Sequence, residues 1–224
     1  FKDGLLVKTD ASGMTQWNRT YGSSGNDEVY AVIQTTDGGF ALVGSTSSYG
    51  VYLDDFWLVK TDPRGMVQWN RTYGSPARDG ASSVIQTADG GFILAGYTES
   101  YEVGFKDVWL VKTDAYGLIQ WNYTCGGLAD EWASTVIKTE DGGFILAGYT
   151  SSYGAGNSDA WLVKLAPIPE TPLTSPETTP ITQETNLSTP QTSPPTEFTP
   201  EFEGISVLLA IPFLFGLRRK FNRK

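Results

Sequence analysis

The sequence predicts an all-β protein whose residues 1–165 form an arc of a β-propeller, with about three four-stranded blades. The chain repeats every 52 residues between Asp3 and Lys164, and periods near this length are typical of propeller blades. Each repeat holds four short apolar or β-branched runs between Gly- and Asp-rich turns, and none has a helical period. The runs are apolar almost throughout, which is typical of strands covered on both faces. The repeat is marked by Trp17, Trp69 and Trp121, by Lys8, Lys60, Lys112 and Lys164, and by Asp-Gly-Gly at 37, 89 and 141.

Each repeat is predicted to fold as two hairpins in series. We expect antiparallel strands near 28–35, 39–46, 55–61 and 66–73, with counterparts one period later. The first turn contains Asp-Gly-Gly, whose glycines tolerate positive φ, and the second begins with Asp and ends with Gly, as type I turns do. Four strands in this order make one blade.

The repeat count predicts an open arc, because three blades are fewer than the four to eight that close a propeller. The sequence starts midway through a repeat at Phe1, and its last copy at 159–164 supplies a third strand without a fourth. We expect the missing strands to come from sequence upstream of Phe1.

Composition excludes several classes of function. The net charge of −9 disfavours nucleic acid as a partner. The chain has no His, which removes the commonest general base and metal ligand, and its one Cys builds neither a disulfide framework nor a zinc cluster. Cys125 stands where other copies have Tyr21 and Tyr73, so we interpret it as a drifted repeat position. We predict no cofactor and no metal site.

The composition changes after Leu165. Residues 166–203 are rich in Pro and Thr, so we expect a disordered, extended stalk with the composition of an O-glycosylated segment. Residues 204–217 are uncharged and predict a short transmembrane helix, and residues 218–224 form a basic tail. Arg218, Arg219 and Lys220 place that tail in the cytoplasm by the positive-inside rule. The expected location is the extracellular face of the cell membrane.

Two resemblances follow from these motifs. The pattern D-x-W-L-V-K-T-D, Q-W-N-x-T-Y-G and V-I-Q-T-x-D-G-G-F-x-L-A-G-Y-T resembles the propeller repeats of large surface proteins in methanogenic and related archaea. The tail, with Pro200, Glu201 and Phe202 before an apolar segment and a basic end, is similar to the Pro-Glu-Phe type of archaeal sorting signal. That resemblance implies an archaeosortase as a partner and removal of the tail. A plain membrane anchor is the alternative.

Four asparagines match the glycosylation pattern: Asn18, Asn70, Asn122 and Asn186. The first three follow the Trp of the outermost predicted strand, where an attached glycan would meet solvent.

Acidic residues recur in three sets, which are Asp10, Asp62 and Asp114; Asp37, Asp89 and Asp141; and Asp27, Asp79 and Asp130. Carboxylates on loops could hold Ca²⁺ or act in pairs in glycoside hydrolysis. Each set lies beside Gly in a predicted turn, so we favour hydrogen bonding to the local backbone. Glu131, Trp132, Asp54 and Glu99 depart from the repeat without forming a local motif.

The aromatic residues of the loops predict a binding function. Most repeated aromatics should lie in the core, but Tyr49, Tyr101 and Tyr153 fall in loops and are candidates for ligand binding. Equivalent loops around a ring suit weak contacts that add by multivalency. We therefore expect a cell-surface module that binds glycan or protein. The alternative is an extracellular glycoside hydrolase of propeller fold whose catalytic carboxylates lie partly in missing blades.

Overall fold

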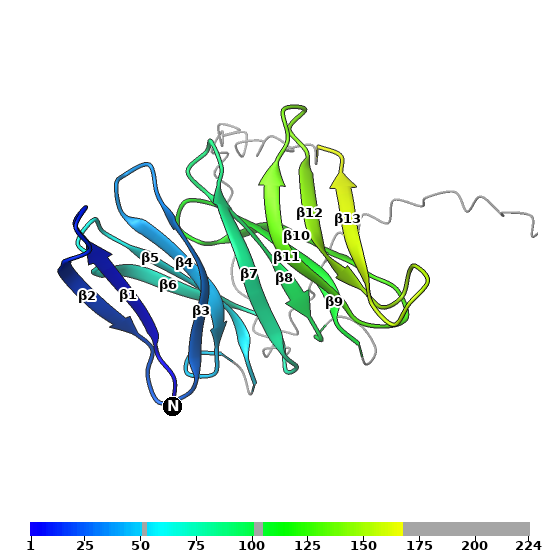
Figure 1. Cartoon of the computed structure of the whole chain (residues 1–224), viewed down its shortest axis with the longest axis horizontal. Coiled ribbons are helices and arrows are strands. Elements are labelled where there is room, and N and C mark those ends of the chain that lie inside the picture. Colours follow the sequence, from blue (N-terminus) through cyan, green and yellow to red (C-terminus); the bar gives the residue numbers. More distant parts are fainter. Residues whose placement is uncertain (51–52, 101–104, 168–224) are drawn as a thin grey trace, which may run out of the picture. The chain divides into compact units, whose positions relative to one another are not determined.

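The computed structural model describes residues 1–50, 53–100 and 105–167. Within these ranges there are 13 antiparallel strands in four sheets and no helix (Figure 1), so the predicted all-β class is confirmed. The four sheets do not close on themselves. Tyr101, Asn186, Pro200, Glu201, Phe202, Arg218, Arg219 and Lys220 lie outside the described residues.

The strands follow the repeat. The first sheet contains β1 (Gly4–Thr9) and β2 (Thr15–Tyr21). The second contains, in spatial order, β3 (Asp27–Gln34), β4 (Phe40–Thr46), β5 (Asp55–Thr61) and β6 (Val67–Tyr73). The third contains β7 (Asp79–Gln86), β8 (Phe92–Thr98), β9 (Asp107–Thr113) and β10 (Ile119–Cys125). The fourth contains β11 (Glu131–Lys138), β12 (Phe144–Thr150) and β13 (Asp159–Leu165). The expected strands at 28–35, 39–46, 55–61 and 66–73 are correct to within one residue.

The sheets stack in chain order through three apolar clusters. The first and second sheets share Tyr21, Leu42, Trp57 and Val59. A larger cluster joins the second and third sheets and contains the fully buried Phe56, Leu58, Phe92 and Leu94. The third joins the third and fourth sheets around Ile93, Leu110, Val136 and Leu146. Each inner sheet is therefore covered on both faces, which explains why its second and third strands are apolar almost without alternation.

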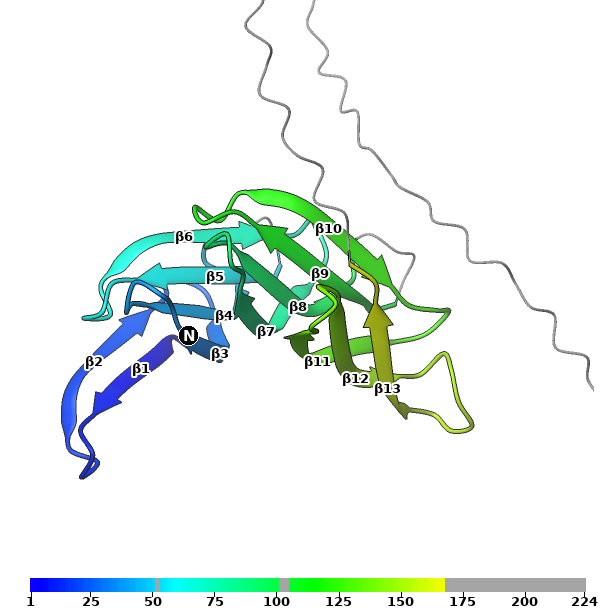
Figure 2. The same cartoon turned by 90° about the horizontal axis from the view of Figure 1, so that it is seen from above.

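The first strands of three sheets define an inner edge. β7 packs against both β3 and β11, while β6 and β10 lie on the opposite side of their sheets (Figure 2). The strand order within each complete sheet therefore runs from the inner edge outward.

Each sheet has two different ends. The turn end carries the hairpin turns, and there the sets Asp10, Asp62, Asp114 and Asp37, Asp89, Asp141 take the turn roles predicted for them. Asp62 Oδ1 accepts the amides of Arg64 at 2.8 Å and Met66 at 2.9 Å. Asp89 accepts the amide of Gly91 at 3.1 Å and pairs with the buried Lys112 at 2.7 Å. The opposite end, which we call the carboxylate end, begins β3, β5, β7, β9 and β11 with an acidic residue.

Cys125 has a structural reason to differ from its counterparts. The hydroxyls of Tyr21 and Tyr73 are buried and donate to the carbonyls of Gly65 and Gly117 in the next sheet, both at 2.9 Å. Those glycines lie in the turn between third and fourth strands. The fourth sheet has no fourth strand among the described residues, so a Tyr in place of Cys125 would have no such acceptor there.

No helix in the described part of the chain is long and apolar enough to cross a membrane. The predicted span at 204–217 lies outside that part.

Candidate functional site

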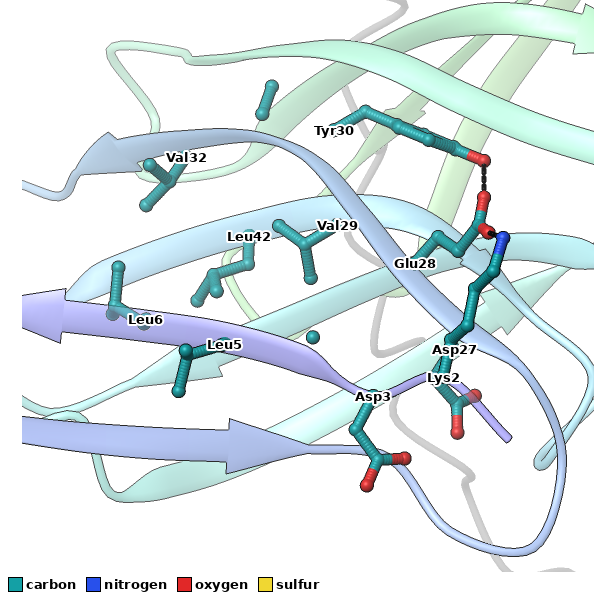
Figure 3. Close-up of a pocket in the computed structure, with 12 residues that line it drawn as sticks. Lys2, Asp3, Leu5, Leu6, Asp27, Glu28, Val29, Tyr30, Val32 and Leu42 are labelled. Atoms are coloured by element: carbon teal, nitrogen blue, oxygen red, sulfur yellow. Dashed lines mark hydrogen bonds and ion pairs between the residues drawn. The ribbon is translucent and has the colours of Figure 1, made fainter.

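Pairs of carboxylates meet between neighbouring sheets at the carboxylate end. A Cβ built on Gly74 would overlap Oδ1 of Asp55 and lie 2.5 Å from Oδ2 of Asp79, so these two side chains face each other. Gly22 lies in the same way between Asp3 and Asp27, and Gly126 between Asp107 and Glu131. Figure 3 shows Asp3 and Asp27 side by side where β1 and β3 begin.

All of these carboxylates except that of the exposed Asp3 are buried, and the buried ones hold the loops of the carboxylate end. Asp79 is fully buried and accepts the Ser100 hydroxyl at 2.7 Å and the Ser75 amide at 3.2 Å. Its burial raises the pKa of its carboxyl above the usual value, although the Thr98 and Ser100 hydroxyls act against that shift. Glu131 accepts the Gly127 amide at 2.6 Å and the Thr150 hydroxyl at 2.6 Å. Asp79 and Glu131 thus each link two loops of their own sheet, and each faces a carboxylate of the preceding sheet.

One acidic set was predicted wrongly. Asp27 and Asp79 do not lie in turns: each is the first residue of an inner strand and is fully buried. Their counterpart in the next sheet is Glu131 and not Asp130, which instead accepts the Lys106 amide at 3.1 Å. The position that corresponds to Asp27 and Asp79 in the next repeat is 131, which holds Glu instead of Asp. The preceding residue, Asp130, is also acidic, so the sequence comparison matched Asp130 instead of Glu131.

Residues that depart from the repeat gather on the inner edge near the carboxylate end. We call this set the variable rim and define it as Glu28, Tyr30, Asp54, Arg78, Glu99, Lys106 and Trp132, together with Tyr97, whose counterparts in the other repeats are Ser45 and Tyr149. They come from β3, β8 and β11 and from the loops that precede β5, β7 and β9. Asp54, Glu99 and Trp132 looked scattered in the sequence, and the fold brings them to one edge.

The rim is aromatic where the third and fourth sheets meet. The rings of Tyr97 and Trp132 lie 4.3 Å apart at an angle of 31°, and the Trp132 indole donates to the Ser82 hydroxyl at 2.8 Å. Lys106 Nζ lies 4.5 Å from the centre of the Tyr97 ring and 5.5 Å from that of Trp132. A Cβ on Gly80 would lie 2.7 Å from the Tyr97 ring, so the glycine makes room for it.

Charged groups interact with this aromatic part. Glu99 lies 3.8 Å from Lys106, and Arg78 lies 4.0 Å from Asp54 across the second and third sheets. Burial raises the pKa of the Tyr97 hydroxyl to about 12, and Glu99 and Asp54 add to that shift. The hydroxyl therefore stays protonated and can donate a hydrogen bond at neutral pH.

At the first junction the rim is more polar. Lys2 pairs with Glu28 at 2.6 Å, and the Tyr30 hydroxyl donates to the same carboxylate (Figure 3). These hydrogen bonds from Lys2 and Tyr30 lower the pKa of Glu28. Tyr30 is half exposed. The rim thus combines exposed ring surface with donors and acceptors that are already oriented.

Two predicted ligand-binding tyrosines have fixed positions in the loops. The Tyr49 hydroxyl donates to the Gly22 carbonyl at 2.8 Å, and its ring stacks on Trp57 at 5.8 Å. Tyr153 repeats both contacts, with Gly126 at 2.9 Å and with Trp161 at 5.8 Å. Each ring remains partly exposed, and neither lies within the variable rim. Their role in binding stays a prediction.

The predicted glycosylation sites occupy the outermost strands. Asn18 on β2 and Asn122 on β10 are exposed, and Asn70 on β6 is half-buried. Asn122 Oδ1 also accepts the indole N–H of Trp109 at 3.4 Å. Glycosylation of these asparagines stays a prediction.

Within the described ranges, no group of three or more His, Cys, Asp or Glu side chains is arranged to hold a metal ion. Cys125 is a free thiol, and burial raises its pKa to about 12, so it is not a reactive thiolate at neutral pH. No family model matches the chain, and no curated protein matches it either.

Proposed function

We propose that the chain is a surface binding module built as an arc of a β-propeller, and that the variable rim is its ligand site. The order of strands from the inner edge outward, the antiparallel pairing and the face-to-face stacking of the sheets support the propeller. The observation that carries the site is the variable rim, where residues that break the repeat come together on one edge of three sheets.

The chemistry of the rim favours a glycan. Sugar rings present apolar C–H faces that stack on aromatic side chains, and hydroxyls that bind carboxylates and guanidinium groups. Trp132 and the half-exposed Tyr30 supply the aromatic surface, and the buried Tyr97 ring contacts that of Trp132. Asp54, Glu99 and Arg78 supply the polar groups. The half-exposed rings of Tyr49 and Tyr153 lie in equivalent loops of the second and fourth sheets and offer further, weaker surfaces for stacking. Several weak contacts of this kind add through multivalency.

Retention on a panel of immobilised polysaccharides tests this function. The full chain should be retained by at least one member, and Trp132→Ala should weaken retention roughly tenfold, the size of one good aromatic contact. Tyr116→Ala is the matched control, because Tyr116 is 71% exposed in a turn at the other end of the third sheet. Equal retention of both variants would contradict a site at the rim.

A glycoside hydrolase is the second candidate. The observation that favours it is the presence of Asp54 and Glu99, two carboxylates of the rim that do not follow the repeat. Such enzymes use two carboxylates across the scissile bond. Release of reducing ends from a retained polysaccharide, lost in Glu99→Gln, would replace the binding function with hydrolysis.

We also propose that residues 204–217 hold the protein to the membrane, with the repeats outside the cell and Arg218, Arg219 and Lys220 in the cytoplasm. Residues 166–203 would act as the stalk. Mass spectrometry of the mature C-terminus separates the two forms of attachment. An end near Pro200–Glu203 fits a sorting signal, and an end at Lys224 fits a plain anchor.

A further inference from the structure

One position at the turn end departs from the repeat in charge. Gln34 ends β3 and Gln86 ends β7, whereas Lys138 ends β11 at the same repeat position. Lys138 is exposed, and within the described ranges it forms no ion pair. The change replaces a side chain that can accept a hydrogen bond by one that can only donate.

Gln86 shows what the glutamine does at this position. Its Oε1 accepts the amide of Thr36 at 2.9 Å, and its Nε2 donates to the carbonyl of Gly90 at 3.2 Å. The side chain therefore links the turn before β4 to the turn before β8. In the next junction Ala88 stands at the position of Thr36, and its amide has no acceptor among the described residues. The Lys138 ammonium cannot accept that amide.

A pocket lies where this glutamine bridge is missing. It has a volume of about 150 Å³ and is lined by Ala88, Lys112 and Trp121 of the third sheet and by Lys138 and Phe144 of the fourth. The rings of Trp121 and Phe144 lie 6.2 Å apart. Pockets for drug-sized ligands hold about 300–1,000 Å³, so this one admits only a small chemical group.

The charged lining of the pocket consists of two lysines and one aspartate. Asp89 pairs with Lys112 at 2.7 Å and also accepts the Thr87 hydroxyl and the Gly91 amide, so its charge is compensated. The charge of Lys138 has no such partner within the described ranges. The pocket therefore has a positive excess.

Lys112 also has donor capacity left over. The equivalent Lys60 ammonium has three acceptors, of which Oε1 of Gln68 at 3.1 Å is one. The Lys112 ammonium has only two acceptors among the described residues. Since an ammonium carries three N–H donors, one is left for a ligand in the pocket that Lys112 lines.

We propose that this pocket binds a small oxyanion group, which is a carboxylate, a sulfate or a phosphate. Its oxygens would accept the Ala88 amide and the ammonium groups of Lys112 and Lys138, in the place that the glutamine oxygen takes in the preceding junction. Hydrogen bonds from ammonium groups to an anion are about twice as strong as bonds between neutral groups. The site lies at the turn end and does not rest on the glycan function proposed for the rim.

Anion titration of the full chain tests the site. Chloride is replaced in turn by sulfate, phosphate or acetate at constant ionic strength, and the amide resonance of Ala88 should shift saturably with at least one of them. The Thr36 amide is already bonded to Gln86 and should not shift. A response to acetate alone assigns a carboxylate, and a response to sulfate or phosphate assigns a tetrahedral group. No saturable shift of Ala88 with any of the three would overturn the inference.

Two matched variants locate the contact. Lys138→Gln restores the residue of the earlier repeats, so the fold should tolerate it, and its side chain should take the Ala88 amide. The affinity for the anion should then fall at least roughly tenfold, the size of one hydrogen bond to a charged group. Arg64→Gln removes an exposed cation from the turn between β5 and β6 and should leave the affinity unchanged. Equal losses in the two variants would contradict the pocket as the site.

Discussion

The two ends of each sheet use acidic residues in opposite ways. At the turn end, Asp89 is partly exposed and pairs with the Lys112 ammonium at 2.7 Å. At the carboxylate end, Asp79 is fully buried and faces the Asp55 carboxylate of the neighbouring sheet. One end therefore gains stability from ionised carboxylates, and the other has to accommodate two acidic groups in a buried space.

The difference shows which end is free to vary. The turn end repeats the same Asp–Lys pair in three sheets, with Asp37 and Lys60, Asp89 and Lys112, and Asp141 and Lys164. The carboxylate end keeps its buried pairs but changes the residues beside them, and there the variable rim forms. The turn end is therefore the more uniform end, and the carboxylate end is the one where we propose that recognition takes place.

The largest effect should come from filling the space between two facing carboxylates. Gly74→Val would push its side chain into Asp55 and Asp79, and we expect a loss of about 3 kcal/mol in the free energy of unfolding. Gly38→Ala is the turn-end control. It has a φ of 81° and room around its Cβ, so it should cost only about 1 kcal/mol. Urea unfolding of both variants measures the difference, and similar losses would contradict tight packing at the carboxylate end.

Removing a turn-end carboxylate should have the next largest effect. Asp89→Ala leaves the Lys112 ammonium, only 5% exposed, without its carboxylate, at an expected cost of about 1–2 kcal/mol near neutral pH.

The same pair predicts a pH dependence. The pKa of Asp89 falls from 3.8 to about 2, because hydrogen bonds from Lys112, Thr87 and the Gly91 amide outweigh its burial. Its contribution is therefore complete above pH 3.8 and is lost as the pH falls through about 2. The difference in free energy of unfolding between the wild type and Asp89→Ala should therefore narrow as the pH falls from 3.8 to about 2. A difference that stays constant over this range would contradict the ion pair.

The carboxylate end should respond to pH with the opposite sign. Burial raises the pKa of Asp79, so the folded state holds its proton more tightly than the unfolded state does. Its ionisation costs stability as the pH rises above 3.8, and acidification removes that cost. Compared with Asp79→Asn, which cannot ionise, the wild type should gain free energy of unfolding as the pH is lowered from 7 towards 4. A larger gain in stability by Asp79→Asn than by the wild type over the same pH range would contradict a raised pKa of Asp79.

The smallest effect is expected at an exposed turn. Asp114 accepts the amides of Tyr116 and Leu118, both at 2.8 Å. Asp114→Ala loses those two bonds, but water can replace them, so we expect about 0.5 kcal/mol. Asp114→Asn keeps a hydrogen-bond acceptor, so its free energy of unfolding should lie between those of Asp114→Ala and the wild type. A loss above 2 kcal/mol in thermal unfolding would place this turn among the tightly packed sites.

The repeated features could be predicted from sequence because they depend on near neighbours in the chain. Asp-Gly-Gly marks the turn before β4, and the strands on either side follow within one residue. The turn roles of Asp62 and Asp89 follow from the adjacent glycines in the same way.

The variable rim could not be predicted, because its contacts join positions in different sheets. Trp132 meets Ser82, 50 residues earlier, and Arg78 meets Asp54. These pairs depend on how adjacent sheets are staggered, which no local pattern encodes. One feature of the sequence pointed to Tyr97. Its partner on β7 is Gly80, and the other repeats have Glu28 and Trp132 at the position of that glycine.

The last strand has a mechanical consequence. Among the strands of the described residues, β13 pairs with β12 alone, through seven residues from Asp159 to Leu165. It is the strand that leads into the C-terminal part of the chain. Tension applied through residue 167 would reach this single ladder of hydrogen bonds before any other part of the fold. If the fourth sheet yields under load, β13 should detach first, while the doubly covered second and third sheets keep their shape.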